Sequence, residues 1–293
     1  MLFTGTGVAI VTPFKNDKTV DFDALQRIIH HCIDGQVDYI VVLGTTGEAT
    51  TLNTGEKADV VRCMVDTVAG RVPIVVGVTC NDTAKVVEDI RHTDFNGISG
   101  LLSATPYYNK PAQAGLIEHF KAVAATSPVP VILYNVPGRT SVNMTAETTL
   151  KLAHEVDNIA GIKEASGNLT QIMQIIKDRP DHFSVISGDD ATSLPLMAVG
   201  SQGVISVAAN ALPLEMSTII RKSLENDNFM AQIAHYKLLE LFELLFVEGS
   251  PSGIKAALHI LGLSENVVRL PLVPVSQKTY HRIESIIQQI KGF

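Results

Sequence analysis

A lysine stands in an apolar run near the middle of the chain, in the segment "NIAGIKEASGN" at residues 158–168. The residues before Lys163 are typical of a buried strand, and lysine is rarely buried without a partner or a chemical use. Strand alternation predicts that Lys163 shares one face with Ile159, Gly161 and Ala165. If that face points inward, the two small residues leave room beside the amine for a small molecule.

A buried amine of this kind can act as a Schiff-base nucleophile. At its ordinary pKa near 10.4, only about one lysine amine in 2,500 is free at pH 7. Burial disfavours the charged form and therefore increases the free fraction. The alternative is a structural lysine that pairs with a buried carboxylate, and the strand alone leaves both interpretations open.

Hydroxyl groups stand at the ends of other apolar runs. Tyr134 ends the run before that of Lys163, and adjacent strands lie about 4.8 Å apart, so its hydroxyl can reach the same reaction centre. Imine formation moves a proton onto a departing hydroxyl and later off carbon, which a phenol connected to solvent can do. Further hydroxyls for such a relay, each also typical of a structural hydrogen bond, are those of Thr45, Thr46 and Tyr108.

Charged residues occupy the neighbouring loops. Arg139 follows the turn "NVPG", and its planar fork suits bidentate binding of a carboxylate, although a lone loop arginine is also typical of a solvated charge. The segment "SGDD", residues 187–190, is a further polar strand end. Its alternative interpretation is structural, with Asp189 or Asp190 as the cap of the helix that begins "ATSLPLM".

Short apolar runs alternate with stretches of helical spacing over the first 225 residues. This alternation predicts an α/β fold with a parallel sheet covered by helices, and eight units fit a (β/α)₈ TIM barrel. A doubly wound open sheet is the alternative, but "GTTGE" at 44–48 lacks the G-x-G-x-x-G spacing typical of that fold. The runs are 8–14, 39–44, 73–79, 100–106, 130–136, 159–165, 183–188 and 203–210.

The strand pattern stops after residue 225. The segments "MAQIAHYKLLELFELLF", "SGIKAALHILGL" and "YHRIESIIQQIKGF" predict three amphipathic helices. We therefore predict a catalytic barrel over 1–225 and a C-terminal three-helix appendage over 226–293, packed on the barrel or on another subunit. In such a barrel the site lies at the carboxyl ends of the strands, where the polar loops gather.

The composition excludes several functional classes. Apolar residues make up 46% of the 293 residues, and the net charge of -7 provides no basic surface for nucleic acid or an anionic membrane. No signal peptide and no 18-residue apolar span is recognised, so we expect a cytoplasmic protein. His30 and His31 lack a third ligand at helical spacing, so neither a metal nor a cofactor is expected. Reduced core thiols are expected at Cys32, Cys63 and Cys80.

Six segments together resemble the motifs of the Schiff-base, pyruvate-dependent aldolase family. The likeness is greatest to its dihydrodipicolinate synthase branch and extends from "GTGVAIVTPF" to "RLPLVPV", nearly the whole chain. It implies a lyase that condenses pyruvate with L-aspartate 4-semialdehyde to give 4-hydroxy-tetrahydrodipicolinate, for lysine and diaminopimelate synthesis. The segments are, in order, "GTTGE", "TPYYNKP", "YNVPGRT", "GIKEASG", "SGDDA" and "GVISV".

The resemblance also implies catalytic roles. Lys163 forms the imine with pyruvate, and Tyr134 donates and accepts protons. The tyrosine acts in a relay with Thr45 and with Tyr108 of the partner subunit. Family members are commonly tetramers built from two tight dimers, so a homotetramer is expected.

The same resemblance assigns the substrate-binding residues. Thr46 and the backbone at Ile205 hold the pyruvate carboxylate, with Gly188 counted among the binding residues. Arg139 receives the carboxylate of the semialdehyde. Sialic acid lyases and sugar-acid aldolases share the lysine and tyrosine, but "YNIPALSG"-like loops lack this arginine, and a non-catalytic barrel is the remaining alternative.

The chain departs from the family pattern in two places. At 248–255 it has "EGSPSGIK" where relatives often have Asn-Pro-x-Pro, a region expected to be remote from the barrel rim. Relatives inhibited by L-lysine bind it with histidines and a glutamate at the tight-dimer interface. Asn81 and Tyr107 still match that site, but a cation replaces the glutamate, so we predict insensitivity to L-lysine. The substituted positions are Thr54, Lys57 and Lys85.

Overall fold

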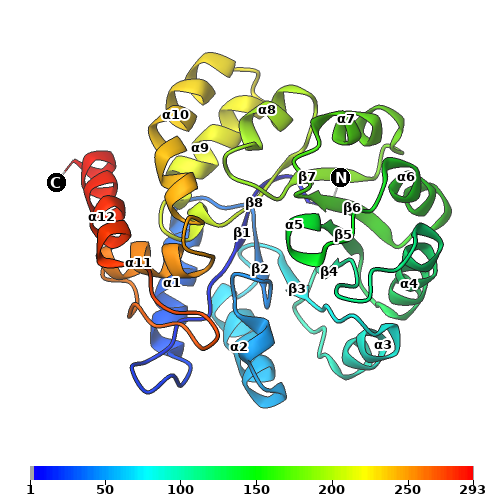
Figure 1. The fold of residues 1–293 in the computed structure, drawn as a ribbon, viewed down its shortest axis with the longest axis horizontal. Coiled ribbons are helices and arrows are strands. Elements are labelled where there is room, and N and C mark those ends of the chain that lie inside the picture. Colours follow the sequence, from blue (N-terminus) through cyan, green and yellow to red (C-terminus); the bar gives the residue numbers. More distant parts are fainter. Residues whose placement is uncertain (1–2, 293) are drawn as a thin grey trace.

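Eight parallel strands pair in sequence order and close into a barrel, with helices around the outside (Figure 1). The computed structural model describes residues 3–292. The predicted (β/α)₈ barrel is confirmed, and an open doubly wound sheet is excluded because β1 pairs with β8. The strands are β1 Gly5–Ala9, β2 Tyr39–Val42, β3 Ile74–Gly77, β4 Gly100–Ala104, β5 Val131–Asn135, β6 Ile159–Glu164, β7 Ser184–Ser187 and β8 Gly203–Ser206.

The helices of the barrel begin where side chains cap their free backbone N–H groups. At α2, for example, the Asn53 side chain accepts from Glu56 N–H and the Glu56 carboxylate accepts from Asn53 N–H, which is a capping box. The helices are α1 Phe22–Asp34, α2 Thr54–Val68, α3 Thr83–His92, α4 Gln113–Thr126, α5 Pro137–Thr140, α6 Ala146–Glu155, α7 Leu169–Asp178, α8 Ser193–Ala198 and α9 Pro213–Leu224, with short 3₁₀ helices η1 Ala49–Thr51 and η2 Ala208–Asn210.

Apolar side chains form one layer inside the barrel and a second layer between the strands and the helices, because alternate side chains point to opposite faces of the sheet. On β5, Ile132 and Tyr134 belong to the barrel interior, whereas Val131 and Leu133 pack against the helices. Cys32 is buried in the helix-facing layer, whereas Cys63 and Cys80 are partly exposed and pack against that layer. The prediction of core thiols is therefore correct only for Cys32. Other interior residues are Phe3, Tyr39, Val41, Val75, Leu102, Ile186 and Ile205.

The β6 strand departs from strict alternation. Val131 pairs with Ile159, but the next residue of β5, Ile132, pairs with Gly161, so the register shifts by one residue. Ile159 consequently packs in the helix-facing layer, while Lys163 pairs with the interior Tyr134. The prediction that Ile159 shares the face of Lys163 is wrong, because it assumed a strand without a bulge.

Three helices follow α9: α10 Asn228–Leu244, α11 Ser252–Ile260 and α12 Gln277–Lys291. The α10 helix packs along α9, α12 packs against α10 and α11, and α11 reaches η2 (Figure 1). That residues 226–293 form a unit separate from the barrel stays a prediction. Among the described residues, no helix is long and apolar enough to cross a membrane.

The expectation that the segment "EGSPSGIK" is remote from the barrel rim is wrong. Its last residue, Lys255, is fully buried and forms an ion pair with Glu48, in the loop that follows β2. No local pattern connects these two positions, which lie 207 residues apart in the chain. This contact joins the C-terminal helices to a loop at the carboxyl end of the barrel.

Candidate active site

Lys163 and Tyr134 lie side by side inside the barrel, near the carboxyl ends of β6 and β5. They are register partners in neighbouring strands, and the Lys163 Nζ lies 4.4 Å from the centroid of the Tyr134 ring. Their exposed fractions are only 5% and 8%. The predicted pairing of an amine with a phenol therefore exists in the folded chain.

The Lys163 amine is buried without a counter-ion. Within residues 3–292 it takes part in no ion pair, so the alternative of a structural lysine paired with a carboxylate is wrong. Burial lowers the pKa of Lys163 to about 8; the Asp190 carboxylate opposes this shift and the Arg139 guanidinium adds to it. At that pKa about one amine in ten is free at pH 7. The site thus provides the nucleophilic form of lysine near neutral pH.

The Tyr134 hydroxyl remains protonated over the same range. Burial raises the pKa of Tyr134 to about 12, while the positive charge of Arg139 lowers it and the Asp189 carboxylate raises it. A neutral phenol beside a free amine can donate a proton to an oxygen that leaves the adjacent carbon. Arg139 therefore favours the reactive form of the lysine and also makes the phenol a better acid.

The close packing beside Lys163 depends on a glycine in the loop that follows β7. A Cβ added to Gly188 would lie 2.8 Å from the Ala165 Cβ and 3.2 Å from the Lys163 Cε. A Cβ at Gly161 would lie 2.6 Å from the Ser184 backbone oxygen, so this glycine allows β7 to approach β6 closely, and a role in leaving room beside the amine stays a prediction. The missing side chain of Gly188 thus lets Ala165 and Lys163 lie directly beside its backbone.

The two threonines of "GTTGE" lie on one tight turn after β2. The Thr46 side chain is buried and the neighbouring Thr45 is exposed. The Glu48 N–H donates to the Thr45 backbone oxygen at 3.1 Å, and Glu48 itself has a left-handed φ of 50°. The turn thus holds the two hydroxyls in different environments, one toward the interior and one at the surface.

The remaining predicted site residues lie on a helix, a strand and a loop. Arg139 is exposed on α5, whose last residue Thr140 accepts a hydrogen bond from Thr105 at 3.1 Å. Ile205 lies on β8 in the interior layer. Tyr108, in contrast, is 87% exposed with a φ of 74°, and the single chain does not bring it to Tyr134. A relay through Tyr108 therefore stays a prediction that requires the partner subunit.

Asp190 has a role that the sequence left open. Its Oδ2 accepts from the N–H groups of Val207 and Ala208 at 3.0 and 2.9 Å, which joins the loop after β7 to the loop after β8. Asp189 accepts instead from Ala191 N–H at 2.8 Å. The prediction that one of them caps the following helix is wrong, because Thr192 is the N-cap of α8.

A buried polar network next to Lys163 was missed by the sequence analysis. The Glu164 carboxylate, 1% exposed, accepts from Ser166 N–H at 2.8 Å and from the side-chain amides of Asn135 and Gln171 at 3.2 Å. Asn135 also donates to Asn143, in the segment after Arg139. A second charged residue directly after Lys163 was the available signal. The network fixes the ends of β5 and β6 where the amine and phenol lie.

A family model described as the dihydrodipicolinate synthetase family matches residues 2–290. The chain belongs to this family. A 4-hydroxy-tetrahydrodipicolinate synthase of Parabacteroides distasonis is 50% identical over 286 residues, which cover 98% of this chain and 96% of the relative. The predicted family, enzyme class and function are confirmed at the level of these relatives.

Solved structures of the dihydrodipicolinate synthetase family agree with this assignment. The dihydrodipicolinate synthase of Aquifex aeolicus superimposes with a TM-score of 0.95 at 42% identity, over 99% of this chain and 98% of that one. The enzyme of Acinetobacter baumannii, solved complexed with pyruvate, gives a TM-score of 0.95 at 37% identity, over 98% and 99%. The barrel and its carboxyl-end loops are therefore those of the family.

The lowered pKa of Lys163 predicts a specific pH dependence. We expect the rate of imine formation with pyruvate to rise about tenfold per pH unit below about pH 8 and then to level off. Burial causes this plateau, since it lowers the pKa from the ordinary lysine value of 10.5 to about 8. The measurement mixes protein and pyruvate at each pH, quenches with borohydride at one fixed pH, and determines the labelled fraction by mass spectrometry. A rate that still rises at about pH 10 would contradict the lowered pKa.

Proposed function

We propose that the chain condenses pyruvate with L-aspartate 4-semialdehyde to give 4-hydroxy-tetrahydrodipicolinate, through an imine on Lys163. The observation that carries this proposal is a buried amine without an ion-pair partner among residues 3–292, 4.4 Å from the ring of a buried phenol. The relatives named for this reaction support the choice of substrates. Lysine and diaminopimelate synthesis would consume the product.

The chemistry begins with attack of the free Lys163 amine on the ketone carbon of pyruvate. Tyr134 donates a proton to the resulting hydroxyl, which leaves as water, and the imine then loses a proton from the methyl carbon to give an enamine. The enamine carbon attacks the aldehyde of the second substrate. The amino group of that substrate finally displaces Lys163 from the imine carbon and closes the ring, so that one water is released overall.

The binding roles follow the positions of the loops. Thr46 and the backbone at Ile205 hold the pyruvate carboxylate, and Gly188 leaves space for the bound molecule beside Lys163. Arg139 receives the carboxylate of the semialdehyde. The exposure of Arg139, together with its effect on the pKa of Tyr134, supports this role, since the guanidinium is open to an incoming anion and still acts on the reaction centre.

Proton transfer to solvent requires a second chain in this proposal. Tyr134 passes protons to Thr45 and to Tyr108 of the partner subunit. The 87% exposure of Tyr108 in the single chain supports such a contact, because large aromatic side chains are enriched at interfaces between subunits. We propose a homotetramer of two tight dimers, acting in the cytoplasm, in which 226–293 is a unit appended to the barrel.

The proposed function predicts covalent labelling of one lysine. Incubation with pyruvate and borohydride should fix the substrate carbons on the peptide that contains Lys163, because reduction traps the imine. Lys255 is the matched control within the same chain: it is buried as well, but its ammonium is held by Glu48. Labelling of another lysine, or of none, would show that the chain lacks this imine chemistry.

Arg139→Ala should separate the two half-reactions. We expect the use of the semialdehyde to fall roughly 10- to 150-fold, since a charged hydrogen-bond donor is lost, while pyruvate still labels Lys163. Steady-state kinetics with each substrate, together with borohydride trapping, provide the measurement. Equal damage to both steps would contradict the assigned role. Faster cleavage of N-acetylneuraminate or a 2-keto-3-deoxy sugar acid would favour a sibling aldolase instead.

The wild-type chain should be insensitive to L-lysine. Lys85 replaces the glutamate of inhibited relatives, and on α3 its ammonium pairs with Glu88 at 3.1 Å and Asp89 at 2.8 Å. A cation at this position repels the side-chain ammonium of the effector, while Asp82 is already used as the N-cap of α3. Activity should remain above half at about 1 mM L-lysine, and Lys85→Glu should increase inhibition. Half-inhibition of the wild type below that concentration would contradict the prediction.

A further inference from the structure

A second buried lysine lies at the edge of the site and is held very differently from Lys163. Lys255, on α11, pairs with Glu48, and both side chains are only 1% exposed. Glu48 is the last residue of "GTTGE", the turn that carries Thr45 and Thr46. The ion pair therefore joins the C-terminal helices to the loop for which the proposed function requires precise placement.

In the Glu48 cluster, defined as Glu48, Lys255 and Arg269, the first two side chains are buried and the third is partly exposed. The Lys255 Nζ donates to the Val267 backbone oxygen at 2.9 Å and lies 3.9 Å from the centroid of the Phe14 ring. The second Glu48 oxygen accepts from Arg269 N–H at 2.9 Å. The glutamate thus receives hydrogen bonds from two separate positions of the C-terminal region.

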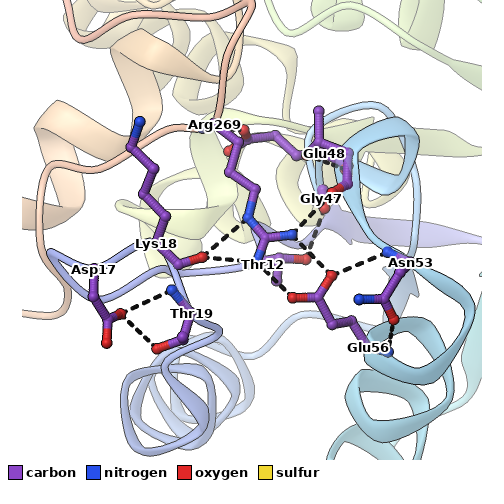
Figure 2. Close-up of polar contacts among 10 residues, drawn as sticks. Thr12, Asp17, Lys18, Thr19, Gly47, Glu48, Asn53, Glu56 and Arg269 are labelled. Atoms are coloured by element: carbon purple, nitrogen blue, oxygen red, sulfur yellow. Dashed lines mark hydrogen bonds and ion pairs between the residues drawn. The ribbon is translucent and has the colours of Figure 1, made fainter.

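Arg269 extends the contact to the outer side of the turn (Figure 2). Its guanidinium donates to the backbone oxygens of Lys18 and Thr51 and forms an ion pair with Glu56. This pairing lowers the pKa of Glu56 to about 2, chiefly through the hydrogen bonds from Arg269. Arg269 thus joins Glu48 to the segment before α1 and to the start of α2, and Figure 2 shows its side chain between Lys18 and Glu56.

The turn itself is constrained at the end where Glu48 lies. Glu48 has a left-handed φ of 50°, its backbone oxygen accepts from Thr51 N–H at 2.9 Å, and Gly47 O accepts from the Thr12 hydroxyl at 2.7 Å. A non-glycine residue in this conformation is maintained only when the surroundings determine it. The contacts of the buried Glu48 carboxylate with Lys255 and Arg269 hold the backbone in this conformation.

We propose that the Glu48 cluster positions Thr45 and Thr46, so that the C-terminal helices control pyruvate binding through this one contact. Two buried charges add little net stability compared with an apolar pair, because both must be desolvated. They do fix a geometry, and catalytic groups must be held within about 0.5 Å of the productive arrangement. This inference rests on the proposed function, in which Thr46 holds the pyruvate carboxylate.

The test measures the pyruvate concentration that gives half-maximal borohydride labelling of Lys163 in the full chain. Glu48→Asp keeps both charges but shortens the link by one methylene, so the turn must shift for the pair to form. Glu48→Gln combined with Lys255→Met removes both charges at nearly constant volume and leaves no unpaired buried ion. For each variant we expect the half-maximal concentration to rise at least about fivefold, a loss of about 1 kcal/mol in pyruvate binding.

A matched control changes an ion pair of the same C-terminal region that does not contact the turn. Arg282 on α12 pairs with Glu240 on α10 at 2.6 Å, and Arg282→Gln with Glu240→Gln neutralises this pair. That control should label like the wild type. Thermal unfolding of all variants separates a loss of fold from a loss of position, since Glu48→Asp should remain folded even if the double variant does not.

The outcomes distinguish the two proposals. If the wild type is not labelled by pyruvate at all, the proposed function is wrong. If the wild type is labelled but either folded Glu48 variant raises the half-maximal pyruvate concentration less than about fivefold, the positioning role is wrong. It is also wrong if the Arg282–Glu240 control raises that concentration as much as the Glu48 variants do. A merely structural contact would lower the unfolding temperature without changing the pyruvate dependence.

Discussion

Desolvation of one amine is the constraint on which the rest of the site depends. Burial lowers the pKa of Lys163 from 10.5 to about 8, which corresponds to about 3 kcal/mol against the charged form. The folded chain tolerates this cost because the barrel interior is filled by apolar side chains and because the neighbouring strands fix the backbone around the amine. Tyr134 and Arg139 can take part in the proposed chemistry only in relation to that amine.

The two buried lysines show how the same side chain serves opposite purposes. Lys255 has a carboxylate and a backbone oxygen as partners, so its charge fixes a loop. Lys163 lies against an aromatic ring, as Lys255 does, and burial lowers the pKa of both amines to about 8. Lys163 has no ion-pair partner among residues 3–292, so it can lose its proton without breaking an ion pair. Burial alone therefore does not identify a catalytic lysine; the identity of the nearest groups decides between a structural and a chemical role.

Much of the fold and part of the site were predictable because they depend on local patterns. Continuous apolar runs alternating with helices are sufficient for a parallel barrel, and sequential strands pair, so Tyr134 and Lys163 had to be neighbours. The face of Ile159 was not predictable, since the bulge in β6 depends on how two strands fit together. The pairing of Glu48 with Lys255 has no local signal, because ion pairs between distant segments follow from the fold itself. The placement of Tyr108 lies beyond any argument from a single chain.

Asp190 shows how the site keeps its lysine unpaired although an anion is near. Its charge raises the pKa of Lys163, so an unrestrained carboxylate would hold the amine protonated. Its Oδ2 is instead bound by the N–H groups of Val207 and Ala208, which direct it toward the loop after β8. The positive charge of Arg139 opposes the remaining effect of the Asp190 charge on the pKa of Lys163. The backbone N–H groups that bind the Asp190 carboxylate therefore contribute to an active amine alongside the burial of Lys163, because they engage a charge that would otherwise favour the protonated form.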